Sequence, residues 1–135
     1  MNGTPKSIEP AIRRRARAVN IVAVLMILFG IAEVFTGFRH NFFGIHTTNV
    51  SMAAYLGAAI GVLYAVAGAL ILTMKKPAVA LALVLLILII IGRVAMVVTG
   101  FYPIDSRPQL VAITLGTTIA AAFAIFIRLN WKIFE

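Results

Sequence analysis

Four separate stretches of this chain are each long and apolar enough to cross a lipid bilayer, and together they take up most of its 135 residues. A hydrocarbon core about 30 Å thick needs about 20 apolar residues in a helix. The stretches are residues 18–38, 52–73, 78–100 and 110–127. Hydrophobic residues make up 62% of the chain and charged residues 12%, whereas soluble domains average about half apolar and a quarter charged. We therefore predict an all-α, polytopic membrane protein with a bundle of four transmembrane helices.

The remaining residues form two tails and three short connections. We expect residues 1–17 to be a cytoplasmic basic tail with a short interfacial helix, capped by Ser7 with Pro10 in its first turn. Residues 18–128 are the transmembrane domain, and residues 129–135 a cytoplasmic C-terminal tail. The first apolar stretch is too long for a signal peptide, so we expect a retained helix. The absence of cysteine excludes disulfides, thiolate metal sites and thiol redox chemistry.

The net charge of +8 comes from basic residues that flank the helices, which argues against binding of nucleic acid. Arg39 and Arg107 lie in the connections on one side of the membrane, and Arg93 lies inside the third helix. The other nine basic residues fall on the opposite side; they are Lys6, Arg13, Arg14, Arg15, Arg17, Lys75, Lys76, Arg128 and Lys132. By the positive-inside rule, we expect both termini in the cytoplasm of a prokaryotic cell.

The arginine cluster before the first helix has two interpretations. Each arginine near an anionic surface contributes on the order of 1 kcal/mol to lipid binding, so the cluster could recruit anionic lipids. The simpler interpretation, which we favour, is that it only sets the orientation. The cluster consists of Arg13, Arg14, Arg15 and Arg17.

The sequence also contains a candidate internal repeat. A shift of 63 residues makes seven of the fourteen positions from Leu25 to Phe38 identical to their counterparts, including a Thr-Gly-Phe triplet at 36–38 and 99–101. The shift also carries small residues of the second helix onto small residues of the fourth: Ala53, Gly57 and Gly61 onto Gly116, Ala120 and Ala124. We predict two tandem helical hairpins related by a pseudo-twofold axis along the membrane normal, with the small residues packing helices within the chain.

Two charged residues, Glu33 and Arg93, lie inside the predicted helices, where a charge costs about 2.5–3.5 kcal/mol on insertion scales. Glu33 shares a helix face with Gly30 and Gly37, so it should point into the bundle. Arg93 corresponds to Gly30 in the repeat. We predict an intramembrane Glu33–Arg93 ion pair, shared with Thr36, Thr99 or Tyr64.

The pair has a structural and a functional interpretation. We favour a structural pair, but Glu33 could instead bind a proton or a substrate, which would make the chain a small proton-coupled transporter. A lone glutamate in the first of four short helices resembles the small multidrug resistance transporters at this one feature. Unlike them, this chain has an arginine-rich tail and places Glu33 near the outer end of the helix.

The outer connections contain a few polar side chains that are weak candidates for a site: His40, His46, Tyr102 and Asp105. The two histidines have neither helical HxxxH spacing nor clustered carboxylates, so we expect no metal and no cofactor. We favour an interfacial aromatic belt that includes Phe42, Phe43, Phe101 and Tyr102 on this side, with Trp131 and Phe134 on the cytoplasmic side.

The stretch from Arg17 to Arg93 resembles the DoxX-like family of small four-helix membrane proteins. The resemblance lies in Gly30-Ile31-Ala32-Glu33, in the spacing of glycines 57, 61 and 68, and in Lys75-Lys76 before an apolar third helix. It implies a membrane subunit tied to a redox partner. Because the chain is short and has no constellation of catalytic groups, we expect an accessory or scaffold subunit, associated with other membrane subunits or with copies of itself, rather than an enzyme.

Overall fold

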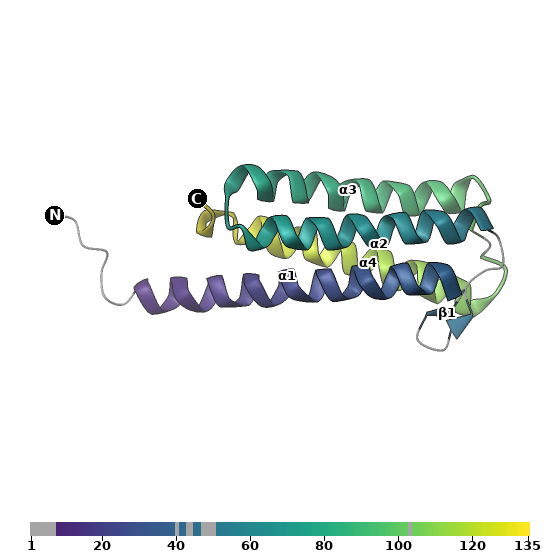
Figure 1. Cartoon of the computed structure of the whole chain (residues 1–135), viewed down its shortest axis with the longest axis horizontal. Helices are drawn as coiled ribbons and strands as arrows, with labels where there is room; N and C mark the ends of the chain where they lie inside the picture. The colour runs from purple at the N-terminus through teal and green to yellow at the C-terminus, as the bar shows by residue number, and fades with distance from the viewer. Residues whose placement is uncertain (1–7, 40, 43–44, 47–50, 103) are drawn as a thin grey trace.

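Each of the four apolar stretches forms one long helix, and the helices lie side by side in an up-and-down bundle (Figure 1). A computed structural model describes residues 8–39, 41–42, 45–46, 51–102 and 104–135. The helices are α1 (Ile8–Arg39), α2 (Ser51–Leu72), α3 (Lys76–Val98) and α4 (Arg107–Leu129). All four are long and apolar enough to span a membrane. The predicted all-α, four-helix membrane bundle is confirmed.

Helix α1 is longer than a bilayer requires. Its 32 residues extend about 48 Å, and its N-terminal turns project beyond the other helices (Figure 1). The predicted separate interfacial helix in residues 1–17 is therefore wrong, because α1 continues unbroken from Ile8. Pro10 lies in the first turn, where proline is tolerated, and neither proline nor glycine follows before Gly30. The proposed cap, Ser7, lies outside the described residues.

Helices α1 and α2 pack with their backbones in close contact, because glycines face each other across the interface. A Cβ added to Gly61 would lie 2.8 Å from the main-chain nitrogen of Val34, and one added to Gly68 would lie 2.6 Å from the carbonyl oxygen of Ala23. Without a hydrophobic drive between helices in lipid, such close approach is what stabilises a pair. Gly61 therefore packs within the chain, as the sequence predicts.

In both α1 and α3, one stripe of residues is buried in the bundle core. The buried stripe of α1 contains Val19, Ala23, Met26, Gly30 and Glu33, and that of α3 contains Ala82, Leu86, Ile89, Arg93 and Met96. Each of these α3 positions lies 63 residues after an α1 position, which is the register that the predicted duplication requires. The duplication itself stays a prediction.

The C-terminal residues fold back onto the turn between α2 and α3. The main-chain nitrogen of Lys76 donates to the main-chain oxygen of Glu135 at 2.6 Å, and the main-chain nitrogen of Glu135 donates to the main-chain oxygen of Met74 at 3.0 Å. A short 3-10 helix, η1 (Trp131–Ile133), precedes this contact. Phe134, predicted to lie in an interfacial belt, is instead buried at 2% exposure. Phe134 directly precedes Glu135 in the chain, so the fold-back brings the ring of Phe134 to the bundle core.

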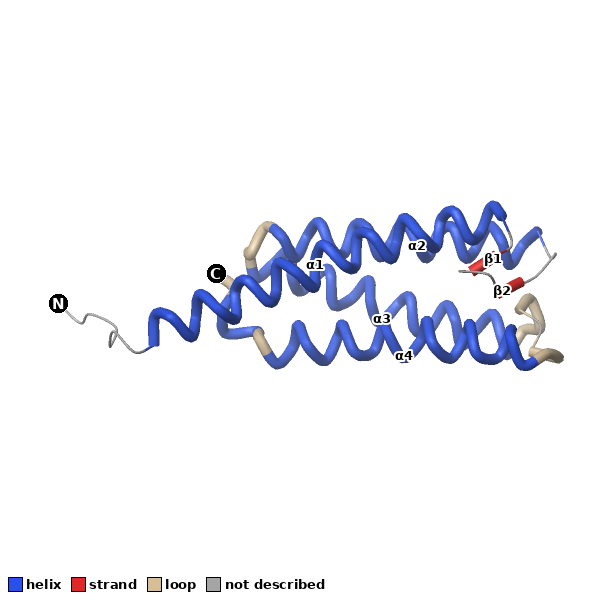
Figure 2. Tube along the Cα trace, turned by 90° about the horizontal axis from the view of Figure 1, so that it is seen from below, coloured by secondary structure: helices blue, strands red, loops and turns tan. Residues whose placement is uncertain are grey.

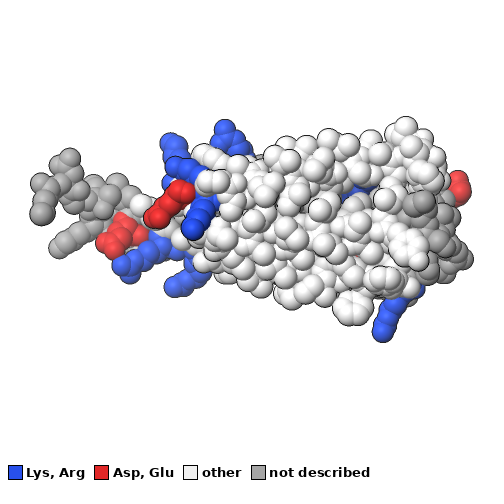
Figure 3. All heavy atoms as spheres, turned by 45° about the horizontal axis from the view of Figure 1, so that its top comes forward, with Lys and Arg blue, Asp and Glu red and all other residues white. Residues whose placement is uncertain are grey.

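The basic side chains gather at one end of the bundle, which we call the basic end (Figure 3). In the described part of the chain they are Arg13, Arg14, Arg15, Arg17, Lys75, Lys76, Arg128 and Lys132. The start of α1 and the C-terminus both lie toward this end (Figure 2). The opposite end, which we call the loop end, carries Arg39, Arg107 and a two-stranded antiparallel ribbon of β1 (Asn41–Phe42) and β2 (Ile45–His46).

Candidate functional site

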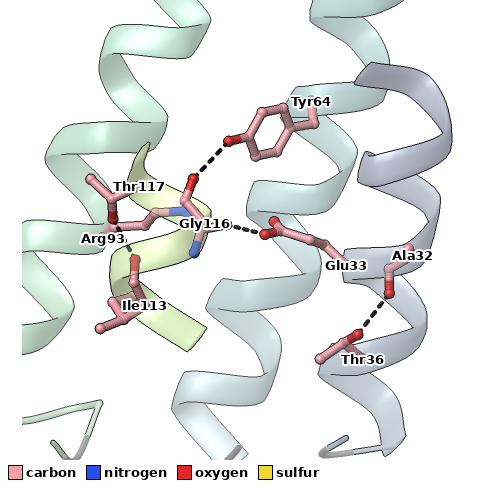
Figure 4. A network of polar contacts seen from close by, with 8 residues as sticks. All are labelled: Ala32, Glu33, Thr36, Tyr64, Arg93, Ile113, Gly116 and Thr117. Carbon is pink, nitrogen blue, oxygen red and sulfur yellow. Dashed lines mark hydrogen bonds and ion pairs between the residues drawn. The ribbon is translucent and has the colours of Figure 1, made fainter. Parts of the chain in front are cut away.

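A buried ion pair crosses the interior of the bundle. The Nη2 group of Arg93, from α3, donates to Oε1 of Glu33, from α1 (Figure 4). The two residues are 7% and 8% exposed, respectively. Each charge compensates the other inside a medium that would otherwise disfavour both. The structure thus contains the ion pair that the sequence predicts.

The other two helices contribute to the same site. Gly116 of α4 lies against the guanidinium, because a Cβ added there would be only 2.6 Å from Nη1 and 2.8 Å from Cζ of Arg93. The hydroxyl of Tyr64, from α2, donates to the carbonyl oxygen of Gly116 at 3.3 Å (Figure 4). One polar cluster, made of Glu33, Tyr64, Arg93 and Gly116, therefore connects all four helices at one depth.

Aromatic packing fixes the tyrosine of this cluster. The ring of Tyr64 meets Phe29 edge to face, with centroids 5.3 Å apart, and Phe123 in the same manner at 6.2 Å. Tyr64 is fully buried. Its ring therefore has rigid neighbours from α1 and α4, and its hydroxyl is held toward Gly116.

Neither threonine named in the prediction shares the ion pair. The hydroxyls of Thr36 and Thr99 donate to the carbonyl oxygens of Ala32 and Ala95, one turn earlier in their own helices. A threonine inside a helix commonly satisfies its hydroxyl in this way, which is why that part of the prediction is wrong. The remaining named residue, Tyr64, reaches the site through Gly116.

Two atoms of the pair have no hydrogen-bond partner among the described residues. They are Oε2 of Glu33 and Nε of Arg93, both buried. Leaving a buried polar group unpaired costs about 1–3 kcal/mol. The cluster is thus neutral overall but retains one acceptor and one donor that are unused within the described chain.

Of the outer-face candidates, Tyr102 lies inside the bundle. Tyr102 is buried at 8% exposure, and its hydroxyl donates to the carbonyl oxygen of Gln109 at 3.2 Å. Burial raises the pKa of its phenol, while the charge of Arg93 lowers that pKa by a smaller amount. Its predicted place in an interfacial belt is wrong, because the side chain is packed inside the bundle; its main-chain nitrogen donates to the main-chain oxygen of Met96 at 3.0 Å.

Of the other candidates on this face, only the side chain of Asp105 is described. Asp105 is exposed, His40 lies outside the described residues, and only the main chain of His46, in β2, is described. Among the described residues, no three histidine, aspartate or glutamate side chains are grouped so that they could hold a metal ion.

The arginine cluster surrounds the projecting turns of α1; we call these four residues, Arg13, Arg14, Arg15 and Arg17, the collar. Arg13 pairs with Glu9 at 2.7 Å, and both side chains are largely exposed. Such an exposed pair contributes roughly 0.3–0.5 kcal/mol. Arg14, Arg15 and Arg17 are exposed as well.

Two lipid-facing grooves lie near the polar cluster. The α1–α4 groove has a volume of about 500 Å³ and the α3–α4 groove about 320 Å³. The α1–α4 groove is lined by Leu25, Leu28, Phe29, Ala32, Ile119, Ala122 and Phe123. The α3–α4 groove is lined by Arg93, Val94, Val97, Val98, Ile104, Leu110, Ile113, Thr114, Thr117 and Thr118.

The part that Gly116 plays beside Arg93 was not predicted from the sequence. The available signal was the row of small residues in α4, which permits another group to come close, but a sequence does not show which group that is.

No protein-family model, curated protein or solved structure matches this chain.

Proposed function

We propose that this integral membrane protein is an accessory or scaffold subunit of a larger membrane complex. The observation that carries the proposal is the polar cluster, in which a neutral ion pair is connected to all four helices. Charges used in this way fix the helix arrangement and present a defined apolar surface to other membrane proteins. A rigid small bundle suits a subunit whose task is to position a partner.

The α1–α4 groove is where we expect a transmembrane helix of the partner to dock. Small residues, Ala32 and Ala122, lie among its larger apolar side chains. Helices in membranes associate where small residues allow close approach. Bulky substitution in this groove should therefore prevent association without disturbing the core.

Affinity purification in a mild detergent, followed by quantitative mass spectrometry, tests this function. Ala122→Phe fills the α1–α4 groove, and Ala95→Phe is its matched control, because Ala95 is an exposed alanine on α3 outside both grooves. We expect a partner to be lost from Ala122→Phe and retained by Ala95→Phe, with equal melting temperatures. If no copurifying protein distinguishes the two variants, the proposal is wrong.

The orientation and location follow the charges. The start of α1 and the C-terminus both lie at the basic end, and we propose that this end faces the cytoplasm of a prokaryotic cell. The collar of Arg13, Arg14, Arg15 and Arg17 would then lie at the depth of the lipid headgroups, where anionic phosphates are its natural partners.

A second candidate function is a small proton-coupled transporter, favoured by the unpartnered Oε2 of Glu33. Proteoliposomes that contain an entrapped pH indicator separate the two functions. A scaffold gives the same proton leak in the wild type and in Glu33→Gln. A proton flux that disappears in Glu33→Gln, in a sample whose thermal unfolding shows that the variant is still folded, would replace the scaffold function with transport.

The resemblance to the DoxX-like family supplies a third candidate, a membrane protein associated with a redox partner. The affinity purification with Ala122→Phe and Ala95→Phe tests this candidate as well. A redox enzyme that copurifies with the wild type and Ala95→Phe, but not with Ala122→Phe, would support it.

A further inference from the structure

The α3–α4 groove combines an apolar wall with polar groups that have no partner in the described chain. Val94, Val97 and Val98 form the wall on α3, whereas α4 presents Thr114, Thr117 and Thr118. Val94, Val98, Thr114 and Thr118 are exposed at the bundle surface, so the groove is open to the surrounding lipid.

The three threonines of this groove differ in their hydrogen bonding. The hydroxyl of Thr117 donates to the carbonyl oxygen of Ile113 at 2.7 Å. Those of Thr114 and Thr118 make no hydrogen bond to the described residues. These two residues are four positions apart in the sequence, so they are neighbours on one helix face, with their Cβ atoms about 5–6 Å apart. In hydrocarbon no water competes for them, and an acceptor oxygen that enters the groove would gain two donors.

Arg93 sets the charge preference of the groove. Its side chain contributes to the inner lining, and its unpartnered Nε lies beneath the surface. The donor makes the inner end of the groove electropositive. Glu33 already neutralises the guanidinium, so an anionic ligand would bring a second negative charge into a medium of low dielectric constant. A neutral acceptor, such as an ester carbonyl, avoids that cost.

We propose that the α3–α4 groove is a binding site for a neutral, single-chain membrane lipid that carries an ester carbonyl, of the monoacylglycerol type. The ester and glycerol oxygens accept from Thr114 and Thr118, and the acyl chain lies along the valines of α3. A volume of about 320 Å³ is at the small end of ligand pockets and suits one chain. This site is separate from the α1–α4 groove and does not depend on the proposed scaffold function.

Photolabelling of the purified full chain in detergent tests the site. The probe is a monoacylglycerol with a diazirine on its acyl chain close to the ester, and the competitors are 1-oleoylglycerol, oleate and 1-octadecene. We expect labelled peptides from α3 and α4. Because two hydrogen bonds are at stake, 1-oleoylglycerol should compete about tenfold better than 1-octadecene. If oleate competes better than 1-oleoylglycerol, the site takes anions and the neutral-ligand proposal is wrong.

Substitutions distinguish binding at a specific site from nonspecific adsorption to an apolar surface. The double variant Thr114→Val with Thr118→Val removes both donors but keeps the side-chain shape, and we expect about tenfold weaker labelling. Val97→Phe, which fills the groove, should do the same. Thr36→Val is the control, because its hydroxyl bonds Ala32 on α1, and it should label like the wild type. Unchanged labelling in the double valine variant, or equal competition by 1-octadecene, would overturn the proposal.

Discussion

Gly116 and Arg93 fit together so closely that α4 has no room for a Cβ at this position. An added Cβ would lie 2.6 Å from Nη1 of the arginine, whose Nη2 is held by Glu33 on the far side. The guanidinium therefore occupies a space bounded by α1 and α4. This relationship makes a glycine in one helix a requirement of an ion pair between two others.

Gly116→Ala should lower the free energy of unfolding by about 1–3 kcal/mol, because the added methyl group collides with a pinned guanidinium. Thermal unfolding in mild detergent measures the loss. Gly57→Ala is the matched control in α2, since no atom lies within 4 Å of its added Cβ, and it should be neutral or stabilising by up to about 1 kcal/mol. In an Arg93→Gln background, where the side chain is shorter, the cost of Gly116→Ala should fall. An undiminished cost would show that the arginine is not the obstacle.

Glu33→Gln and Arg93→Gln should each destabilise the bundle by about 3–5 kcal/mol, because each leaves an uncompensated buried charge. The double variant, which buries no charge, should cost clearly less than the sum. The exchanged variant, Glu33→Arg with Arg93→Glu, should recover part of the loss. A double-mutant cycle on thermal unfolding in detergent measures the coupling. Strictly additive effects would contradict the contact.

Gly61→Ala should destabilise the protein by roughly 3 kcal/mol or more, and by more than Gly116→Ala, because the obstruction is main chain rather than a flexible side chain. Its added Cβ lies 2.8 Å from the nitrogen of Val34, so α1 and α2 must separate. Gly92→Ala is the control, because the nearest atom to a Cβ added at Gly92 is Cδ1 of Ile60, at 4.0 Å. Unfolding midpoints that are equal for both variants would disprove the tight α1–α2 contact.

The glycines of the two Thr-Gly-Phe triplets, Gly37 and Gly100, should differ in how replacement by asparagine changes the stability of the protein. Gly100 has φ +78 and open space around it, so Gly100→Ala should cost about 1 kcal/mol through strain alone, and Gly100→Asn less, because asparagine tolerates this conformation. Gly37 instead lies within a helix, where an added Cβ would be 2.7 Å from the oxygen of Ala54, so Gly37→Asn should be worse than Gly37→Ala. Melting temperatures of the four variants test this order, and a common order at both glycines would contradict it.

The orientation can be tested directly, because the chain contains no cysteine and each introduced cysteine is a unique label. Lys132→Cys and Asp105→Cys replace exposed residues at the basic end and the loop end. With the basic end in the cytoplasm, a membrane-impermeant maleimide should label Asp105→Cys in intact cells and Lys132→Cys only after lysis. The reverse pattern would show an inverted topology.

The fold could be predicted because its main signals are local in the sequence. Apolar length specifies the spans, and the absence of glycine and proline between Pro10 and Gly30 keeps α1 continuous. The two buried charges also had few possible partners, so Glu33 and Arg93 could be paired from their faces and depths. The partners of hydroxyl groups were harder to predict. Thr36 and Thr99 had a nearer acceptor in their own helices, and helical propensity does not reveal that choice.

The sequence by itself determined that this protein lies in a membrane, that four helices cross it and that two charges inside must meet, because hydrocarbon tolerates neither exposed backbone nor a lone charge. Only the tertiary structure decided what each small residue does. Gly37 and Gly100 occupy matching triplets, yet one lets two backbones touch and the other ends a helix with a positive φ. That difference depends on which atoms lie opposite each glycine, which is a property of packing and not of the local sequence.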